Sequence, residues 1–158
     1  MIRRRVVRAV MLTPDRHVLL MRVQEPISGN EFWVTPGGGL EPGESDVDAL
    51  RREVAEETGA TKFSPRQLVW SRQCDFTWDN RDYSQREYFY RVQTDRFEPV
   101  MDGNPAQGEA SAFREFRWWS IDDIGRSEET FSPQYLHSLL ECLTRNGPAE
   151  GPAGVGDE

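Results

Sequence analysis

Apolar residues recur along the chain in short runs separated by polar turns, a pattern typical of several short β-strands. The first run, Val6–Leu12, is interrupted only by Arg8, and the polar turn Thr13–Arg16 separates it from the next run. Further along, Tyr88 and Tyr90 occupy alternate positions and most of the residues next to them are charged, a roughly period-two pattern that is typical of a strand. The predicted strands cover residues 5–12, 17–23, 32–35, 67–76, 86–94 and 116–119.

Two helices are indicated by capping residues and by apolar residues at helical spacing. The first helix is predicted to follow the N-cap residue Ser45 and to end at Gly59. The second is predicted to have Ser132 as its N-cap and Pro133 as its first residue. A short helical turn is expected after Ser120, between the last strand and this second helix.

The chain is predicted to form one domain followed by a disordered tail. A length of 158 residues suits a single hydrophobic core. The strands and helices together predict a mixed α+β architecture over residues 1–146. Residues 147–158 are mainly Ala, Gly, Pro and acids, which cannot build a core, so we expect this tail to be disordered.

Charge and composition exclude several classes of protein. The 19 basic and 27 acidic residues give a formal net charge of −8, which argues against a general nucleic-acid binder. No apolar run approaches the ~20 residues that cross a bilayer, and the apolar stretch after Arg3–Arg5 is too short for a secretory signal. Cys74 and Cys142 fit neither a disulfide framework nor a metal motif. We therefore expect a soluble, cytoplasmic protein, monomeric or homodimeric, with no nucleic-acid or membrane partner.

Acidic residues are concentrated in residues 41–60, where seven acids accompany two arginines. On a helical wheel, Val47, Leu50 and Val54 form a stripe that we expect to face the sheet. The acidic block is either a solvated helix face or a cation-binding surface, and composition alone leaves both interpretations open.

Three carboxylates lie beside this stripe: Glu53, Glu56 and Glu57 share an arc of about 100°. Like charges at this spacing repel one another, and a bound divalent cation would relieve the repulsion. Arg52 lies four residues before Glu56, where it can pair with that carboxylate. Because ligation by carboxylates alone selects hard ions, Mg²⁺ is the expected metal, with Mn²⁺ as the alternative.

A glycine-rich loop, residues 36–44, precedes this helix but is not a P-loop, because no Gly-Lys-Ser/Thr follows it. Residues 38–60, GGLEPGESDVDALRREVAEETGA, resemble the Nudix box, whose pattern is G-x5-E-x7-R-E-U-x-E-E-x-G-U with U a bulky aliphatic residue. The departure is Ala60 at the last U, where a small residue affects packing after the helix rather than the chemistry. The matching positions are Gly38, Glu44, Arg52, Glu53, Val54, Glu56, Glu57 and Gly59.

The resemblance implies a Nudix-type α/β/α sandwich with a mixed sheet, a catalytic helix after the glycine-rich loop and a C-terminal helix. It also implies a hydrolase that cleaves the diphosphate linkage of a nucleoside diphosphate joined to another moiety. By position in the box, Glu53 and Glu57 would be the principal metal ligands, with Glu56 a ligand or helper. The carbonyl of Gly38 would be a backbone ligand.

Other acidic and basic residues have supporting roles by the same resemblance: Glu44 would brace the loop and Arg52 would orient the glutamates. The general base for the attacking water differs among family members, some using a box glutamate and others a glutamate on a later loop. Of the later acids, Glu109 lies in a Gly/Pro-rich segment and Glu115 in the last predicted strand. We favour Glu109, because a loop can close over bound substrate.

The sequence specifies the substrate only coarsely. Five tryptophans offer stacking surfaces for a base, although their strand positions predict that most of them lie in the core. Trp33 and Trp78 are the predicted substrate-binding aromatics, and Glu41 of the glycine-rich loop is a predicted polar contact. The arginines at residues 3–5 either hold substrate phosphates or form an exposed strand edge.

Two other functions stay open at this point. Relatives of this kind that only sense a nucleotide or bind a partner commonly lose box carboxylates, whereas this chain keeps all three. A diphosphate isomerase on the same scaffold would require a catalytic cysteine and inserted segments, and nothing in the sequence assigns that role to Cys74.

Overall fold

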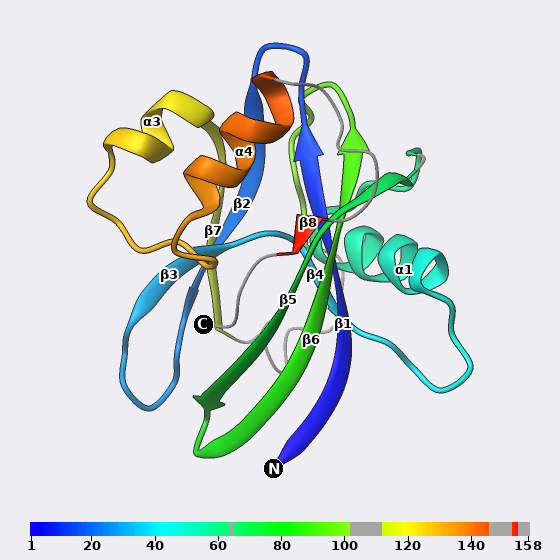
Figure 1. Ribbon diagram of the computed structural model, residues 1–158, viewed down its shortest axis with the longest axis vertical. Helices are drawn as coiled ribbons and strands as arrows, with labels where there is room; N and C mark the ends of the chain where they lie inside the picture. Colours follow the sequence, from blue (N-terminus) through cyan, green and yellow to red (C-terminus); the bar gives the residue numbers. More distant parts are fainter. Residues whose placement is uncertain (64, 102–111, 146–152, 155–158) are drawn as a thin grey trace.

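The computed structural model describes residues 1–63, 65–101, 112–145 and 153–154 of the chain. Long, curled strands form its centre, with helix α1 (Asp46–Thr58) on one side and helices α3 (Ile121–Arg126) and α4 (Leu136–Arg145) on the other (Figure 1). This arrangement confirms the predicted sandwich of helices around a mixed sheet. The strands are β1 (Ile2–Leu12), β2 (His17–Gln24), β3 (Glu31–Val34), β4 (Gly37–Gly39), β5 (Pro65–Trp78), β6 (Arg81–Gln93), β7 (Phe113–Ser120) and β8 (Ala153–Gly154).

Strand β1 is central and pairs along both of its edges. Over its whole length it runs parallel to β6. Its other edge pairs antiparallel with β4 around Val6–Arg8, and with β2 at Leu12. The strand order is β3-β2-β1-β6-β5-β8, with β7 paired to β2. Part of the glycine-rich loop is therefore a short strand, β4, that lies directly against the middle of β1.

Successive residues of β1 face opposite sides of the sheet, as the strand period of two requires. Val10 and Leu12 belong to the hydrophobic cluster that contains the buried leucines of α4. Val7, Ala9 and Met11 belong to a second cluster, which contains the buried face of α1. The two helical layers are thus anchored on opposite faces of one strand.

The predicted ends of α1 are confirmed by its caps. The Ser45 hydroxyl accepts a hydrogen bond from the backbone N–H of Asp48 at 3.1 Å. At the other end, Gly59 has a φ of 82°, and its N–H donates to the carbonyl of Ala55 at 3.0 Å. Ser120 caps α3 in the same way, so the short helical turn predicted after it is also present.

The buried stripe of α1 differs from the prediction at one residue. Val47 is 42% exposed, and Ala49 is buried with the rest of the stripe instead. The cause is the preceding residue, Asp46, whose carboxylate accepts hydrogen bonds from Arg5 and from the hydroxyl of Tyr90. These contacts turn Asp46 toward the sheet, and the next residue, about 100° further around the helix, faces solvent.

Helix α4 begins later than predicted, at Leu136 rather than at Pro133. The residue expected to cap it, Ser132, is used elsewhere: its N–H donates to the Trp33 carbonyl at 2.9 Å, and its hydroxyl accepts from Arg72 Nη2 at 2.9 Å. Both interactions hold this residue against the sheet, so the helix begins only after the chain has turned away.

Strands β5 and β6 are longer than predicted and form one continuous hairpin. They meet at the two-residue turn Asp79–Asn80, where φ is 51° and 61°. Positive φ at both central residues is the geometry that matches the twist of the flanking strands. Trp78 and Arg81 therefore form the last pair of the hairpin ladder.

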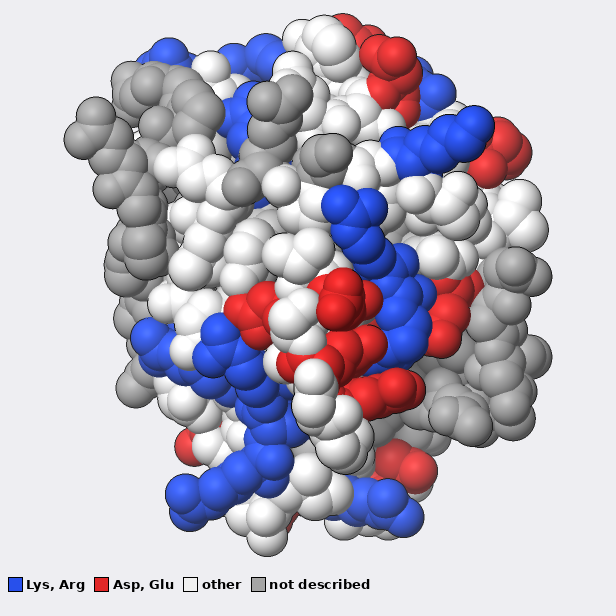
Figure 2. All heavy atoms as spheres, turned by 90° about the vertical axis from the view of Figure 1, so that its right-hand side faces the viewer, with Lys and Arg blue, Asp and Glu red and all other residues white. Residues whose placement is uncertain are grey.

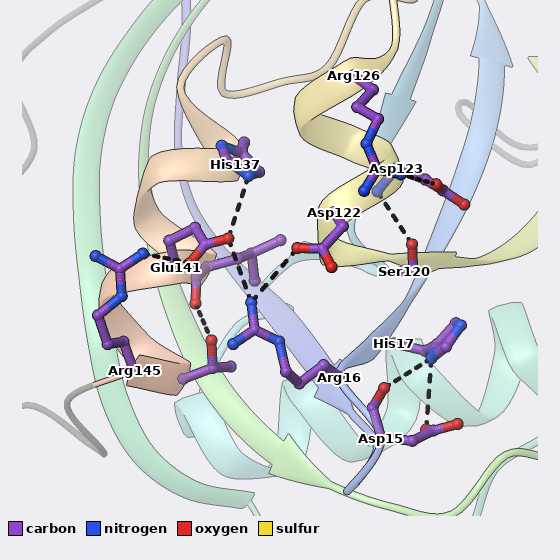
Figure 3. A network of polar contacts seen from close by, with 12 residues as sticks. Asp15, Arg16, His17, Ser120, Asp122, Asp123, Arg126, His137, Glu141 and Arg145 are labelled. Atoms are coloured by element: carbon purple, nitrogen blue, oxygen red, sulfur yellow. Dashed lines mark hydrogen bonds and ion pairs between the residues drawn. The ribbon is translucent and has the colours of Figure 1, made fainter.

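A polar network ties α3 and α4 to the turn between β1 and β2 (Figure 3). Glu141 of α4 accepts hydrogen bonds from Arg16 Nη2 at 3.2 Å and from Arg145 Nη2 at 2.9 Å, and it lies 3.4 Å from His137 Nε2. Arg16 Nη2 is also 3.9 Å from Asp122 Oδ1 of α3. Because most of these groups reach solvent, each pair adds little to stability.

Of the predicted tail at 147–158, only Ala153–Gly154 are described, and they pair parallel to β5 as strand β8. The other tail residues lie outside the described part of the chain, so disorder of the tail stays a prediction. Among the described residues, none of the helices combines the length and the apolarity needed to span a membrane.

Candidate functional site

The central contact of the site joins Glu53 on α1 to the glycine-rich strand β4. A Cβ atom built on Gly38 would lie 2.6 Å from Glu53 Cδ and 2.7 Å from both of its carboxylate oxygens. A side chain at this position would therefore displace the carboxylate. The residue must be glycine for Glu53 to lie against the backbone of the loop.

Arg52 connects the loop to this carboxylate. Its Nε and Nη2 donate to the two carboxylate oxygens of Glu44 at 2.8 and 2.9 Å, and its Nη1 donates to Glu53 Oε1 at 2.8 Å. Nη2 also donates to the Gly39 carbonyl at 3.1 Å. The guanidinium thus holds together the loop and the first of the predicted metal ligands, and these contacts suit the implied roles of Glu44 and Arg52.

The other two box glutamates are placed differently from each other. Glu57 Oε2 accepts from the N–H of Gly37 at 3.2 Å, which puts its carboxylate at the same strand as Glu53. Glu56 is on the rim, with a side chain 49% exposed and 3.6 Å from Arg52 Nη1. The structure therefore brings Glu53 and Glu57 to the glycine-rich strand and leaves Glu56 at the edge.

Burial and hydrogen bonding shift the titration of these groups in opposite directions. Burial raises the pKa of Glu53, and the Arg52 guanidinium opposes that rise. The hydrogen bonds from Arg52 and from the backbone N–H of Glu41 lower the pKa of Glu44 to about 2.

Figure 2 shows acidic side chains gathered on the α1 face of the molecule, with basic side chains beside them. Arg52, Glu44, Glu53, Glu56 and Glu57, which we call the Glu53 cluster, carry more negative than positive charge.

The chemistry of the donors in this cluster fits a hard cation. Carboxylate and carbonyl oxygens are the ligands that Mg²⁺ and Mn²⁺ prefer, and neither histidine nor cysteine belongs to the cluster. In the part of the chain that the structure describes, no three His, Cys, Asp or Glu side chains converge closely enough to hold a metal ion together. Glu56 points outward, so only two carboxylates of the cluster, those of Glu53 and Glu57, meet at β4. Mg²⁺ binding by Glu53, Glu56, Glu57 and the Gly38 carbonyl stays a prediction.

A cleft of about 880 Å³ lies on the face of β1 opposite α1. We call it the sheet cleft. Its floor comes from β1, β5 and β6, and its walls come from the β2–β3 hairpin and residues 130–134. The half-buried Trp78 lies on its wall with its ring perpendicular to that of Phe32, at 6.0 Å between centroids. These rings offer apolar surface to a planar ligand.

Three buried charged residues, which we call the Arg8 triad, form the floor of the sheet cleft. Glu87, Arg72 and Arg8 are only 1%, 3% and 6% exposed. Glu87 accepts from Arg8 Nε at 3.1 Å through one oxygen and from Arg72 Nε at 2.8 Å through the other. Burial alone would raise the pKa of Glu87, but its attraction to the two guanidinium groups lowers it overall, so the carboxylate is ionised.

The sequence reasoning missed this triad, although one signal pointed to it. Arg8 is the single charged residue within the apolar run 6–12, and a charge in a central strand must be paired where it is buried. Its partner Glu87 is 79 residues away in the chain, and Arg72 lies on a third strand. No local pattern connects the three.

The Glu53 cluster and the sheet cleft share the segment between β3 and β4. Phe32 lines the cleft, and the carbonyl of Thr35 accepts from Arg8 Nη1 at 3.2 Å. Two residues further on, the N–H of Gly37 donates to Glu57. The two candidate sites are therefore linked through this short segment between β3 and β4.

The structure buries Trp33, which is one of the two predicted substrate-binding aromatics. Its side chain is 1% exposed, so it offers no ring face to a ligand. The ring packs edge-on against Trp119 at 5.3 Å between centroids, and its Nε1 donates to Glu129 at 2.9 Å. Trp33 is a core residue, as the strand pattern predicted for most of the tryptophans.

The remaining predicted residues are placed as follows. Glu41 is on the rim, with a side chain 66% exposed and 3.8 Å from Arg52 Nε. Glu115 lies on β7 and accepts from Arg22 Nε at 3.2 Å. The favoured general base, Glu109, lies outside the described residues. The assignment of the general base stays a prediction.

Comparison with known proteins identifies the class to which this fold and this loop–helix arrangement belong. The sequence model of the NUDIX domain matches residues 2–140, so the chain belongs to the NUDIX domain family. Curated members of this family that resemble the chain are named as hydrolases.

Individual relatives are distant. Diphosphoinositol polyphosphate phosphohydrolase 2 of Mus musculus is 29% identical over 126 residues, which cover 77% of this chain and 63% of the relative. The match thus spans less than two thirds of that protein. Nucleoside triphosphatase NudI of Escherichia fergusonii is 29% identical over 114 residues, which cover 70% of this chain and 77% of NudI.

Solved structures agree on the fold. The MutT protein from Methanosarcina mazei Go1 superposes with a TM-score of 0.63 at 23% identity, covering 92% of this chain and 95% of that one. The E. coli dihydroneopterin triphosphate pyrophosphohydrolase superposes with a TM-score of 0.64 at 14% identity. The superposition covers 93% of this chain and 100% of that chain.

Proposed function

We propose that this protein is a Mg²⁺-dependent pyrophosphohydrolase that cleaves the diphosphate linkage of a nucleoside diphosphate joined to another moiety. One arrangement carries the proposal: Arg52 holds the Glu53 carboxylate against Gly38, and a short segment of chain, anchored by Thr35 and Gly37, connects this strand to a cleft of about 880 Å³ with an aromatic wall. A cleft of this size accommodates a nucleoside. A nucleotide with its base in the cleft would then need its phosphates to extend past this segment to the carboxylates around Glu53.

The residues of the Glu53 cluster divide the work between ligation and positioning. Glu53, Glu57 and the Gly38 carbonyl are the proposed metal ligands, with Glu56 joining from the rim. Bound Mg²⁺ would offset the charge of the phosphates and lower the pKa of an attacking water. Arg52 is a positioning residue, because it holds the Glu53 carboxylate in place through Nη1. The N–H of Gly37 restrains Glu57 in the same manner.

In the proposed reaction, water attacks one phosphorus and the other phosphate leaves with the bridging oxygen. The proton of the water must pass to a carboxylate, which is a box glutamate or Glu109 in this proposal.

The aromatic wall favours a nucleoside over other groups that carry a diphosphate. The two curated relatives described above are named for a diphosphoinositol polyphosphate and for nucleoside triphosphates. Phe32 and Trp78 present rings to the cleft, and such rings bind a flat aromatic base better than a saturated, highly charged ring.

A non-catalytic nucleotide-sensing module is the second candidate. It is favoured by one observation, the absence of three converging metal-binding side chains among the described residues. The two candidates differ in a simple respect, since a sensor binds the nucleotide and leaves it intact.

The deciding experiment incubates the purified protein with Mg²⁺ and a panel of nucleoside triphosphates, oxidised nucleotides, dinucleotides, nucleotide sugars and ADP-ribose, with products identified by mass spectrometry. We expect at least one compound to be cleaved between two phosphates and EDTA to abolish the cleavage. If a nucleotide binds but no product forms in either Mg²⁺ or Mn²⁺, the hydrolase proposal is rejected in favour of the nucleotide-sensing module.

A further inference from the structure

A group of arginines occupies the part of the sheet that α1 leaves uncovered. The first residues of β1 and the facing residues of β6 extend past this helix (Figure 1). Arg5 lies at the beginning of the helix, where its Nε and Nη2 donate to the Asp46 carboxylate at 2.8 and 2.7 Å. Alternate residues of a strand share a face. Arg3 therefore lies on the same side of the sheet as Arg5, but further from the helix.

Strand β6 adds a third arginine to this face. Cζ of Arg5 lies 3.8 Å from the centroid of the Tyr88 ring, so Tyr88 faces the α1 side. Arg86 comes two residues earlier and shares that face. In the parallel ladder Arg86 is the register partner of Arg5, and Ser84 is the register partner of Arg3. We call Arg3, Ser84 and Arg86 the Arg3 patch.

The two arginines of this patch have unused hydrogen-bond donors, since each guanidinium carries five N–H groups. Both side chains are exposed. In the part of the chain that the structure describes, Arg3 forms no hydrogen bond or ion pair. Arg86 forms one hydrogen bond, from Nη2 to Ser71 Oγ at 3.2 Å. Arg5 differs from them, because it is already committed to Asp46.

The positive charges of this face lie close together. Arg5 and Arg86 are direct neighbours in the ladder, and like charges in that position repel each other. Two acids share the face, but Asp46 is paired with Arg5, and Asp75 accepts from Gln73 Nε2 at 3.4 Å. Among the described residues, no carboxylate forms an ion pair with the arginines of the Arg3 patch. A bound anion would relieve the repulsion.

Protection of a sheet edge does not explain both arginines. Charged side chains on an edge strand prevent pairing with another chain, and this role alone could account for Arg3. Strand β6, however, lies between β1 and β5. Arg86 has a register partner on each side, Arg5 in β1 and Gln73 in β5. It therefore has no free edge to protect, and a ligand explains its position better.

The Arg3 patch and the Glu53 cluster share the α1 side of β1. Gly38, which lies against Glu53, is the register partner of Val7. At a rise of about 3.3 Å per residue, Arg5 is about 7 Å and Arg3 about 13 Å along the strand from Val7. A group that continues from a diphosphate at the Glu53 cluster therefore reaches the Arg3 patch without crossing the sheet.

We propose that Arg3 and Arg86 bind phosphate groups on the moiety beyond the cleaved linkage. The preferred substrates would then carry further phosphates there instead of a neutral sugar. Guanidinium groups form short, charge-assisted hydrogen bonds to phosphate, often two at once, and the Ser84 hydroxyl can add a donor. The inference rests on the proposed function, because it assumes that the cleaved diphosphate lies at the Glu53 cluster.

Calorimetry with inorganic tripolyphosphate, in EDTA so that no metal contributes, tests the site by itself. We expect the wild-type protein to bind this probe, and Arg3→Gln and Arg86→Gln each to weaken binding by about fivefold or more. The double variant should bind more weakly than either single variant. Equal dissociation constants for the wild type and the double variant would overturn the inference, as would absence of binding to the wild type.

The matched control is Arg126→Gln, which removes one exposed arginine from α3, on the opposite side of the sheet. It changes the net charge equally and should keep the wild-type affinity. Arg3→Lys and Arg86→Lys keep the charge and should lose less affinity than the glutamine variants, whereas equal losses would contradict a charge-based site. Thermal unfolding shows whether each variant folds. If Arg86→Gln does not, Arg3→Gln decides, because this side chain is exposed and unpaired among the described residues.

Kinetics in Mg²⁺ connects the patch to the reaction. Nucleoside tetraphosphates are compared with nucleotide sugars of the same base. We expect kcat/KM to be about tenfold or more higher for the tetraphosphates, mainly through KM, and the ratio to fall to about twofold or less in the double variant. Equal values for the two kinds of compound in the wild type would overturn the assignment of the substrate class.

The two experiments together separate this inference from the proposed function. Tripolyphosphate binding that depends on Arg3 and Arg86, without cleavage of any compound, would remove the hydrolase and retain the phosphate site. Cleavage of a nucleotide compound, with tripolyphosphate binding unchanged in the double variant, would retain the hydrolase and remove the phosphate site.

Discussion

Two clusters of arginine and carboxylate groups lie on opposite faces of β1, and they differ in which of the two kinds of group is held by the other. On the α1 side, Arg52 lies within 4 Å of three glutamates of the Glu53 cluster, namely Glu44, Glu53 and Glu56. On the other side, two arginines share Glu87. The same kinds of hydrogen bond therefore hold carboxylates against the glycine-rich strand on one face and hold two guanidinium groups at a buried carboxylate on the other.

The clusters also differ in burial. The Arg8 triad is buried at the sheet, so loss of one partner would leave a buried charge unpaired. The free energy of unfolding would then fall by several kcal/mol. Residues of the Glu53 cluster reach solvent, so single substitutions there should alter activity far more than stability. The following substitutions probe this difference.

The largest effect is expected for Glu53→Gln and Glu57→Gln. Each replaces a proposed metal ligand by a neutral amide, so kcat should fall by about 100-fold or more while the melting temperature changes little. Glu141→Gln, on α4, is the matched control and should keep the wild-type kcat. Wild-type rates in both cluster variants would eliminate the metal assignment.

A smaller loss of activity is expected for Gly38→Ala. The added methyl group meets only the end of the flexible Glu53 side chain, which can move, so the fold should be retained while kcat falls by about tenfold. Gly43→Ala provides the contrast: its Cβ meets open space, but its φ is +77°, so it should lose about 1 kcal/mol of stability and keep kcat. Kinetics and thermal unfolding of both variants check the pair. Unchanged kcat in Gly38→Ala would show that the exact position of the carboxylate is unimportant.

Asp46→Asn is expected to change stability in a pH-dependent way. The Arg5 hydrogen bond lowers the pKa of Asp46 in the folded state, so its stabilisation is complete above the unfolded pKa of about 3.9 and is lost as the pH falls through the lower folded value. The variant should therefore unfold more easily by about 1–3 kcal/mol at pH 7. The difference from wild type should shrink below about pH 4. Urea unfolding at several pH values measures this, with Asp48→Asn as the exposed control, and a difference independent of pH would contradict the assignment.

The smallest effect is expected for Glu141→Gln, which removes the carboxylate at the centre of the network in Figure 3. Its partners Arg16 and Arg145 are 43% and 70% exposed, so the loss should stay below about 1 kcal/mol and decrease further in 1 M NaCl. Urea unfolding at low and high salt tests this. A fall in kcat would contradict the view that this edge of the molecule is separate from the site.

Local patterns in the sequence predicted the parts of the molecule that local interactions determine. The ends of α1 follow from Ser45 and Gly59, whose capping interactions involve residues three or four positions away. The side of α1 that faces the sheet was less predictable, because Asp46 is turned inward by Arg5, which is 41 residues distant. Val47 was misplaced for that reason.

The candidate site shows the same division. The box residues lie within one loop and one helix, so their spacing alone brings Arg52, Glu53 and Gly38 together. The Arg8 triad is assembled from three strands and left no periodic signal. Trp33 and Trp78 both lie in strands, and only the packing of the whole chain shows which one is in the core and which one lines the cleft.

The short segment between β3 and β4 connects the two candidate sites and limits how far they can move relative to each other. Thr35 is fastened to Arg8 at 3.2 Å, and Gly37 is fastened to Glu57 at 3.2 Å, with a single residue between them. The residue between them is Pro36, whose ring fixes φ, so this short segment restrains the separation of the two anchor points. The position of the Arg8 triad relative to the Glu53 cluster is therefore restrained by this segment and not by the surrounding loops.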